Sequence, residues 1–172
     1  MAMLDEQLVE EWLNRKGYFT MRGVKSGVDE IDFLALKYTN GTAQFLHVEV
    51  QISFRPIGYL GGNSSAKSRD EAEIKAGVQE WIKKKFTSEK KMQMRAGISS
   101  DADWQYMFVC ANLKKDSEPH VLDVMKNATG KPIEIVRYSE VLKNLQADSG
   151  HQSSSIASDI TELLKYLNPA TS

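Results

Sequence analysis

The chain has 172 residues, 41% of them hydrophobic, and a formal net charge of -1. This length is enough to bury one good core and short for two, so we expect a single globular domain. No segment approaches the roughly 18 to 20 apolar residues of a membrane span, and the first residues are acidic where a signal peptide is basic. We therefore expect a soluble, cytoplasmic protein without a membrane partner. The near-zero net charge neither requires nor excludes a polyanionic partner.

The first half of the chain predicts a helix followed by three strands. Apolar residues recur at helical spacing over 3–16, and Gly17 provides a stop signal. Short apolar or alternating runs predict strands over 18–24, 30–38 and 43–53. Asn40-Gly41 between the last two strands is typical of a tight hairpin turn. We therefore expect an antiparallel three-stranded meander.

The second half predicts alternating helices and strands around this meander. Residues 54–68 are rich in Gly and Ser and predict a long loop, and helical spacing returns over 69–87. After a polar connection, an apolar strand is expected from residue 104, then a helix over 117–130, a strand over 131–138 and a short helix. The predicted fold is α/β, with a central mixed sheet, the meander plus further strands, flanked by helices. The domain spans 1–147, a polar linker 148–155, and a C-terminal helix 156–172.

Two acidic residues lie in the middle of neighbouring predicted strands. Alternate side chains of a strand share a face, so Glu30 and Asp32 share one face, as do His47, Glu49 and Gln51. Across a short turn, the carboxylates of Asp32 and Glu49 come close if both use the same side of the sheet. Two such charges repel unless a cation separates them, and oxygen ligands favour magnesium or manganese. The alternative is that both residues lie on a solvated sheet face, although each is bracketed by apolar neighbours.

The helix, the meander and the acidic pattern together resemble the PD-(D/E)XK nuclease superfamily. The N-terminal half is particularly similar to archaeal Holliday-junction resolvases, over the stretches "DEQLVEEWLNRKGYF", "SGVDEIDFLAL" and "HVEVQIS". The resemblance covers roughly residues 4–53, and the predicted helix after residue 69 agrees in order. It implies a restriction-endonuclease-like core.

The resemblance also implies roles for individual residues. Glu6 takes the acidic position on the first helix, Asp32 that of the second strand and Glu49 that of the third, while Gln51 stands where the family usually has lysine. The implied catalytic set is Glu6, Asp32, Glu49 and Gln51. The implied Mg²⁺ or Mn²⁺ ligands are Asp32, Glu49, the Val50 carbonyl and Glu6. A glutamine can hold water but brings no positive charge, and Lys75 or Lys25 are candidates for a replacement cation.

Basic residues near these positions suggest a nucleic-acid partner. Positive charge is dense at Lys75, Lys83, Lys84, Lys85, Lys90, Lys91 and Arg95. Arg22, Lys25 and Arg55 lie near the predicted site, and we expect Arg22, Lys25, Arg55, Lys75 and Lys83 to bind nucleic acid. Few aromatic residues interleave with them, which favours duplex or branched DNA over a stacked single strand, without excluding RNA. Resolvase-like proteins cut paired strands, so the resemblance also suggests a homodimer.

Two functions remain in competition. The first is a metal-dependent endonuclease that hydrolyses phosphodiester bonds in duplex or branched DNA. The second is a nuclease-like fold that has lost catalysis and acts as a module that binds nucleic acid or protein. Gln51 is the residue that favours the second function.

Overall fold

The computed structural model describes residues 2–52, 70–127, 130–147, 159–160 and 162–163. Its elements are α1 (Ala2–Arg15), β1 (Phe19–Ser26), β2 (Asp29–Thr39), β3 (Thr42–Gln51), α2 (Glu71–Ile82), the π-helical turn η1 (Lys83–Thr87), α3 (Glu89–Ala96), β4 (Trp104–Cys110), α4 (Glu118–Asn127), β5 (Ile133–Arg137) and α5 (Tyr138–Ala147). The predicted loop 54–68, the linker 148–155 and most of the predicted C-terminal helix lie outside the described residues. None of the described helices is long and apolar enough to cross a membrane.

The five strands form one open sheet in chain order, β1-β2-β3-β4-β5. β1, β2 and β3 pair antiparallel, whereas β4 pairs parallel to β3 and β5 parallel to β4. The α/β class and the mixed sheet flanked by helices are confirmed. The prediction of a three-stranded meander plus further strands is corrected to one continuous five-stranded mixed sheet, in which β3 pairs with β2 on one side and with β4 on the other. Parallel neighbours need a crossover, which the α2–α3 region and α4 supply.

The β2–β3 hairpin turns where the sequence predicts it. Asn40 and Gly41 both have positive φ, of 52° and 80°. A two-residue turn with both central residues in this region matches the twist of the flanking strands, and asparagine and glycine tolerate it best. The turn fixes the register Thr39↔Thr42 through Phe33↔Val48. This register decides which side chains of β2 and β3 lie opposite one another.

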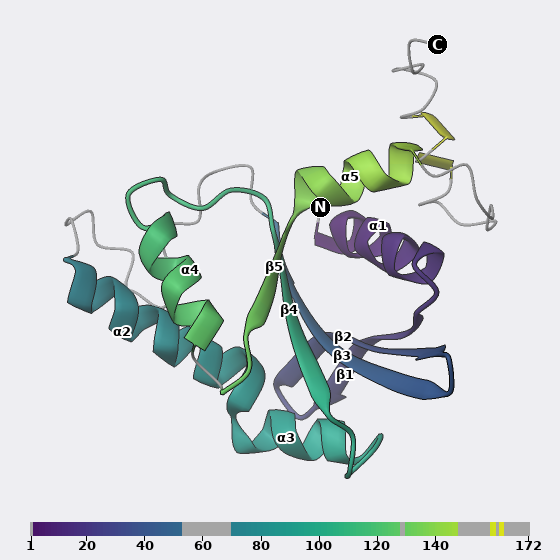
Figure 1. The fold of residues 1–172 in the computed structure, drawn as a ribbon, viewed down its shortest axis with the longest axis horizontal. Helices are drawn as coiled ribbons and strands as arrows, with labels where there is room; N and C mark the ends of the chain where they lie inside the picture. Colours follow the sequence, from purple (N-terminus) through teal and green to yellow (C-terminus); the bar gives the residue numbers. More distant parts are fainter. Residues whose placement is uncertain (1, 53–69, 128–129, 148–158, 161, 164–172) are drawn as a thin grey trace.

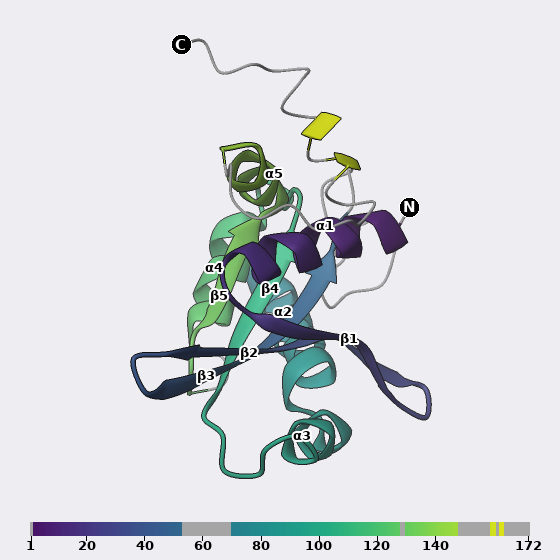
Figure 2. The ribbon, with the colours of Figure 1, turned by 90° about the vertical axis from the view of Figure 1, so that its right-hand side faces the viewer.

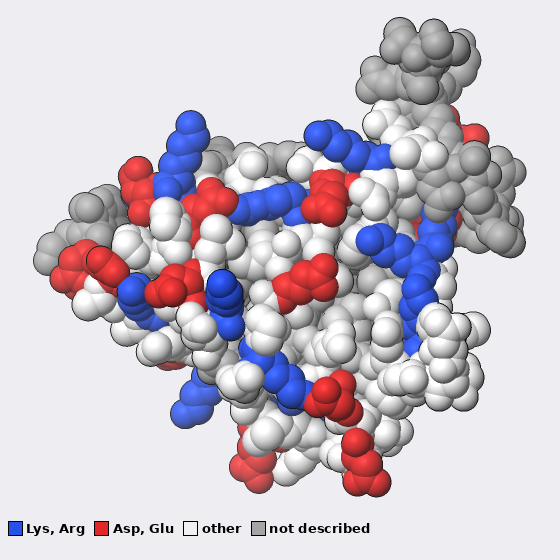
Figure 3. Space-filling model, in the orientation of Figure 1, with Lys and Arg blue, Asp and Glu red and all other residues white. Residues whose placement is uncertain are grey.

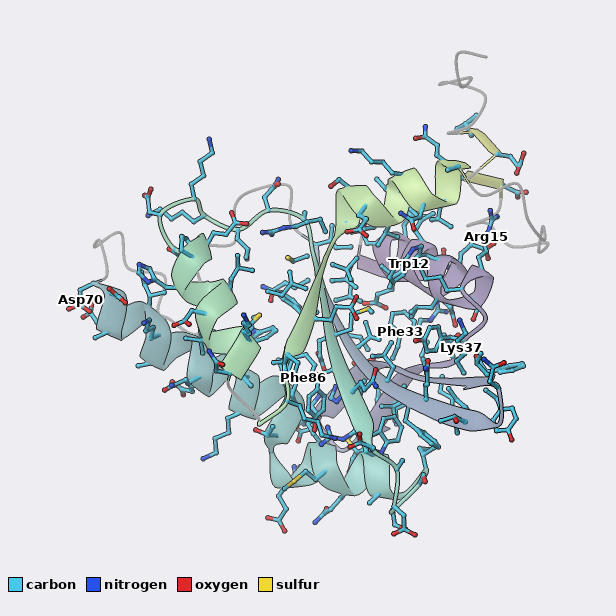
Figure 4. All side chains as sticks on the ribbon, viewed as in Figure 1. Trp12, Arg15, Phe33, Lys37, Asp70 and Phe86 are labelled. Atoms are coloured by element: carbon cyan, nitrogen blue, oxygen red, sulfur yellow. The ribbon has the colours of Figure 1, made fainter. Side chains whose placement is uncertain are left out.

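The helices cover the sheet from both sides, as Figures 1 and 2 show. α1 and α5 pack on one face, over a core that includes Trp12, Phe33, Val48 and Val109. α2 and α4 pack on the other, where Phe86 is fully buried beside Phe108. Figure 4 shows Trp12 and Phe33 on the α1 side of the sheet and Phe86 on the side of α2 and α3. Both faces of the central strands are therefore dry, which explains their nearly continuous apolar sequences.

The predicted helix over 69–87 is corrected in its second half. α2 ends at Ile82, five residues follow as a π-helical turn, and Ser88 caps a separate helix, α3. The sequence interpretation missed α3 because its inward positions are Lys91 and Arg95, four residues apart. Charged residues at buried helix positions give no apolar period, so the segment looks like a solvated connection.

The core on the α1 side predicts a large cost for truncating Phe33. Its side chain is fully buried, so Phe33→Ala should lower the free energy of unfolding by about 3 to 5 kcal/mol, through lost burial and the cavity left behind. Val28→Ala is the control, because Val28 is almost fully exposed and should change stability by less than about 0.5 kcal/mol. Urea unfolding of both variants measures the difference. Equal effects would contradict the assignment of Phe33 to the core.

Candidate functional site

β2 and β3 separate at the point where their acidic residues lie opposite each other. Their paired register ends at Phe33↔Val48, yet β2 stays paired with β1 as far as Asp29 and β3 stays paired with β4 as far as Gln51. The two strands therefore form a fork. The next opposed positions along this register are Asp32 and Glu49. The divergence leaves room for carboxyl groups between β2 and β3, which are joined by backbone hydrogen bonds over the rest of the hairpin.

Polar side chains satisfy backbone groups at the fork. The Val50 N–H donates to Oδ2 of Asp32 at 2.7 Å, in place of a strand carbonyl. On the other side, the Lys91 ammonium donates to the backbone carbonyl of Glu30 and lies 3.3 Å from Oε1 of Glu49. Lys91 thus bridges the two diverging strands. Buried backbone groups without partners are costly, so these two side chains make the fork possible.

Glu49 is the centre of a buried ionic cluster. Its side chain is only 1% exposed, yet both of its oxygens have partners. Oε1 contacts Lys91 and lies 3.0 Å from Nε2 of His47, and Oε2 accepts from the Lys85 ammonium at 2.6 Å. A buried charge is tolerated when it is paired and hydrogen-bonded in this way. The interpretation of Glu49 as a residue of a solvated sheet face is therefore wrong.

The two carboxyl groups influence each other. Burial, and next to it the negative charge of Glu49, raise the pKa of Asp32 from its ordinary 3.8 to about 6, although the Val50 N–H and Lys85 act in the opposite direction. Asp32 and Glu49 therefore come close enough to repel, as the sequence predicts. The positive charge of the cluster offsets this repulsion only in part.

Lys85 provides a positive charge next to both acidic residues. Burial opposes its charged form, but Glu49 and Asp32 outweigh that effect and raise the pKa of the ammonium group. Lys85 therefore stays charged at neutral pH. It comes from η1, and its side chain is 31% exposed, so it reaches the site from the surface of the helical layer.

Glu6 lies at the margin of this site. Burial raises its pKa, followed by the charges of Asp32 and Glu30, while Arg22 lowers it. The structure thus places Glu6 within electrostatic range of Asp32. Val50 contributes its N–H to Asp32, and the predicted use of its carbonyl stays a prediction. Gln51 is exposed at the end of β3, two positions beyond Glu49.

Of the other predicted cations, some pair with acidic residues, one is exposed and one lies outside the described residues. Lys75 pairs with Glu71 at 2.9 Å and with Asp123 at 3.3 Å, so its proposed role as the replacement cation is corrected. Lys25 is largely exposed and contacts Glu30, and Arg22 pairs with Glu10. Lys83 is exposed on η1, while Arg55 lies outside the described residues.

Sequence analysis grouped Lys85, Lys91 and Arg95 with the basic residues that suggest a nucleic-acid partner and gave these three no role at the acidic pair. Lys85, Lys91 and Arg95 point into the site, and Lys91 and Arg95 are almost fully buried. Their signal in the sequence is the spacing of Lys91 and Arg95 on one helix face after the capping residue Ser88. Lys90, next to them, faces the other way and pairs with Asp29.

The residues at the fork are suited to bind a hard cation. Asp32 and Glu49 offer carboxylate oxygens, and burial together with the charge of Glu49 raises the pKa of Asp32, an effect that a cation between the two groups would oppose. Among the described residues, no three His, Cys, Asp or Glu side chains stand in an arrangement that could hold a metal ion. A metal at the fork would therefore combine two side chains with backbone oxygen, water or substrate.

Comparisons of the chain with family models, curated proteins and solved structures give no significant match. The resemblance to PD-(D/E)XK nucleases therefore stays a hypothesis that depends on the residues at the fork.

The raised pKa of Asp32 predicts a pH dependence of stability. The folded state binds this proton more tightly than the unfolded chain, so the free energy of unfolding should fall as pH rises from about 4 to 7. A pKa increase of about two units corresponds to about 3 kcal/mol. Urea unfolding of wild type and Asp32→Asn should show the variant gaining this amount relative to wild type over that range. A constant difference between the two proteins would contradict the raised pKa.

Proposed function

We propose that this protein is a Mg²⁺- or Mn²⁺-dependent endonuclease that hydrolyses phosphodiester bonds in duplex or branched DNA. One observation supports the proposal above the others: Asp32 and Glu49 converge at a strand fork, with the Lys85 ammonium 2.6 Å from Glu49. Carboxylate oxygens can hold a divalent ion that activates water for phosphodiester hydrolysis, and a lysine beside them can offset charge on the phosphate. In this proposal the domain has the restriction-endonuclease-like core that the sequence resemblance implies.

Asp32 and Glu49 would hold the metal, with Glu6 near enough to add charge. When bound, the metal polarises the phosphate and lowers the pKa of a bound water. The Val50 N–H fixes the orientation of the Asp32 carboxylate by holding Oδ2. His47 and Lys91 hold Oε1 of Glu49, which leaves Oε2 as the oxygen that can exchange partners.

Lys85 takes the role that the family gives to a lysine at the position of Gln51. Because its ammonium stays charged and is partly exposed, it can leave Oε2 of Glu49 and contact a phosphate oxygen. Such a preorganised cation stabilises the negative charge that develops as the phosphate is attacked. Gln51, exposed at the end of β3, would orient water through its amide.

The surface charge bears on how DNA is held. On the face shown in Figure 3, lysine and arginine side chains are interspersed with acidic ones, so this face is not a continuous basic surface. Exposed lysines at Lys83, Lys84 and Lys90 lie close in sequence to Lys85, on η1 and α3. We propose that DNA approaches the fork from this side, because phosphate contacts depend on local positive charge.

A second candidate function has its own support. Both oxygens of Glu49 are already bound by ammonium groups, so the cluster balances much of its charge without a metal. A fold that has lost catalysis could keep such a cluster for stability alone and serve as a binding module. Metal binding and DNA cleavage separate these two functions.

Metal titration is the direct test of the nuclease proposal. Calorimetry with Mn²⁺ should show site-specific heat for wild type and none for Asp32→Asn, because the variant loses a negatively charged ligand. Asp29→Asn is the matched control, since Asp29 lies on the same strand but pairs with Lys90. With Mg²⁺, wild type should cut supercoiled plasmid or a four-way junction, and EDTA should stop it. Heat without cleavage would support the binding module, and no heat would contradict the metal site.

Exchanging the lysine tests the role of Lys85. Lys85→Met should slow cleavage by about 10² to 10³, the usual effect of removing one group that stabilises transition-state charge. The double variant Lys85→Met/Gln51→Lys should recover part of this loss, because it returns a cation to the family position. Lys131→Met, which removes a lysine that pairs with Asp103 and has no place in the proposed site, should leave the rate unchanged. Unchanged cleavage by Lys85→Met would refute the assignment, and urea unfolding shows whether each variant remains folded.

A further inference from the structure

His47 and Arg95 form a buried chain of hydrogen bonds that ends on Glu49. The His47 ring is fully buried between Phe86 and Tyr106, with ring centroids 4.9 Å and 6.0 Å away. Its Nδ1 lies 2.9 Å from a guanidinium nitrogen of Arg95, and its Nε2 lies 3.0 Å from Oε1 of Glu49. The sequence alone leaves His47 as a polar sheet residue.

The donors and acceptors in this chain allow one arrangement. A guanidinium group can only donate, so Nδ1 of His47 must accept from Arg95 and carries no proton. Nε2 then carries the proton, and its N–H donates a hydrogen bond to Oε1 of Glu49. Burial, and next to it the positive charge of Arg95, keep the pKa of the ring well below its ordinary value, which agrees with a neutral imidazole. The tautomer is therefore set from the side of the ring that faces away from Glu49.

Arg95 is itself fixed in place. Its guanidinium donates to the backbone carbonyl of Phe86 at 2.6 Å and to the Tyr106 hydroxyl at 3.3 Å, and it lies over the Tyr106 ring. These contacts join α3, η1 and β4. Because five donors of the guanidinium are held in one plane, its position determines the position of the imidazole.

The two oxygens of Glu49 consequently differ. Oε1 is held by two groups that are almost fully buried, His47 and Lys91. Oε2 accepts from Lys85, whose side chain is partly exposed. The geometry of the carboxylate is therefore set at Oε1, and Oε2 is the oxygen that can change partner without disturbing the core.

We propose that His47, held by Arg95 as its Nε2–H tautomer, is a positioning residue that fixes Oε1 of Glu49 and so keeps Oε2 turned toward Lys85. The role of this positioning in metal binding rests on the proposed function, in which Oε2 contacts the metal. The tautomer of His47 and its hydrogen bonds do not depend on that function. Partners of this kind fix the orientation of a ligating side chain, and their removal typically reduces metal affinity or activity by about 10- to 100-fold.

Nuclear magnetic resonance tests the tautomer directly in the metal-free protein. The ring nitrogen shifts of ¹⁵N-labelled wild type should show a protonated Nε2 and an unprotonated Nδ1 for His47. In Arg95→Leu, which removes the donor to Nδ1, Nδ1 is no longer held without a proton, so protonation of Nδ1 should appear while Glu49 keeps the proton on Nε2. A protonated Nδ1 in the wild type would overturn the proposal. This reading is independent of metal binding, so it stands even if the nuclease proposal fails.

Two substitutions of His47 separate positioning from packing. The Gln amide nitrogen can reach the place of Nε2, so His47→Gln should keep Mn²⁺ affinity within a few-fold of wild type in calorimetry. His47→Leu fills the space without a donor and should lose about 10- to 100-fold. Equal losses in both variants, or no loss in His47→Leu, would overturn the role of the hydrogen bond. Circular dichroism and urea unfolding identify any variant that is not folded.

If wild type itself shows no heat of Mn²⁺ binding, the proposed nuclease function fails. The tautomer of His47 then tests the positioning role by itself. A protonated Nε2 and an unprotonated Nδ1 in wild type, with a proton appearing on Nδ1 in Arg95→Leu, would still support His47 as the residue that orients Glu49. A ring that prefers neither nitrogen would overturn the positioning role as well.

Discussion

The fork between β2 and β3 is the constraint on which the rest of the site depends. Two paired strands that separate inside a covered sheet leave backbone groups that water cannot reach, and these groups need partners from side chains. Asp32 and Lys91 provide them, through the Val50 N–H and the Glu30 carbonyl. One of these partners is negative and the other positive. The need to satisfy the backbone therefore brings charge into the core, and the remaining cluster balances that charge.

The ionic cluster links three elements of the protein, β3, η1 and α3. Glu49 lies on the sheet, Lys85 comes from η1, and Lys91 and Arg95 come from α3. Removing one partner from such a group usually costs more than the pair contributes, because the other charge is left buried. The π-helical turn of η1 bears Lys85 on this side and buries Phe86 against His47. The charged contacts of Lys91 and Arg95 and the packing of the adjoining Phe86 therefore both hold α3 against the sheet.

The nuclease proposal and the positioning of Glu49 stand on different parts of this cluster. The nuclease proposal depends on Asp32, on Oε2 of Glu49 and on Lys85, whose partly exposed ammonium can exchange Glu49 for another partner. The second depends on His47, Arg95 and Lys91, which are almost completely buried. This division resembles the usual construction of a metal site, in which outer groups hold the ligands in a fixed orientation. It also explains how a cluster with charged groups can be both stable and able to exchange partners.

The sequence by itself determined the strands and the hairpin at Asn40-Gly41, because alternation and a two-residue turn fix register over short distances. It also placed Asp32 and Glu49 on neighbouring strands, and the structure decided that the two converge. Only the tertiary structure decided which cation completes the site. Lys85 is far from Glu49 in the chain, and nothing local in the sequence distinguishes it from Lys75, which pairs with Glu71 instead. Sequence analysis missed helix α3 for the same reason. Its buried side chains, Lys91 and Arg95, are charged, and charged residues are expected at the surface unless their partners are known.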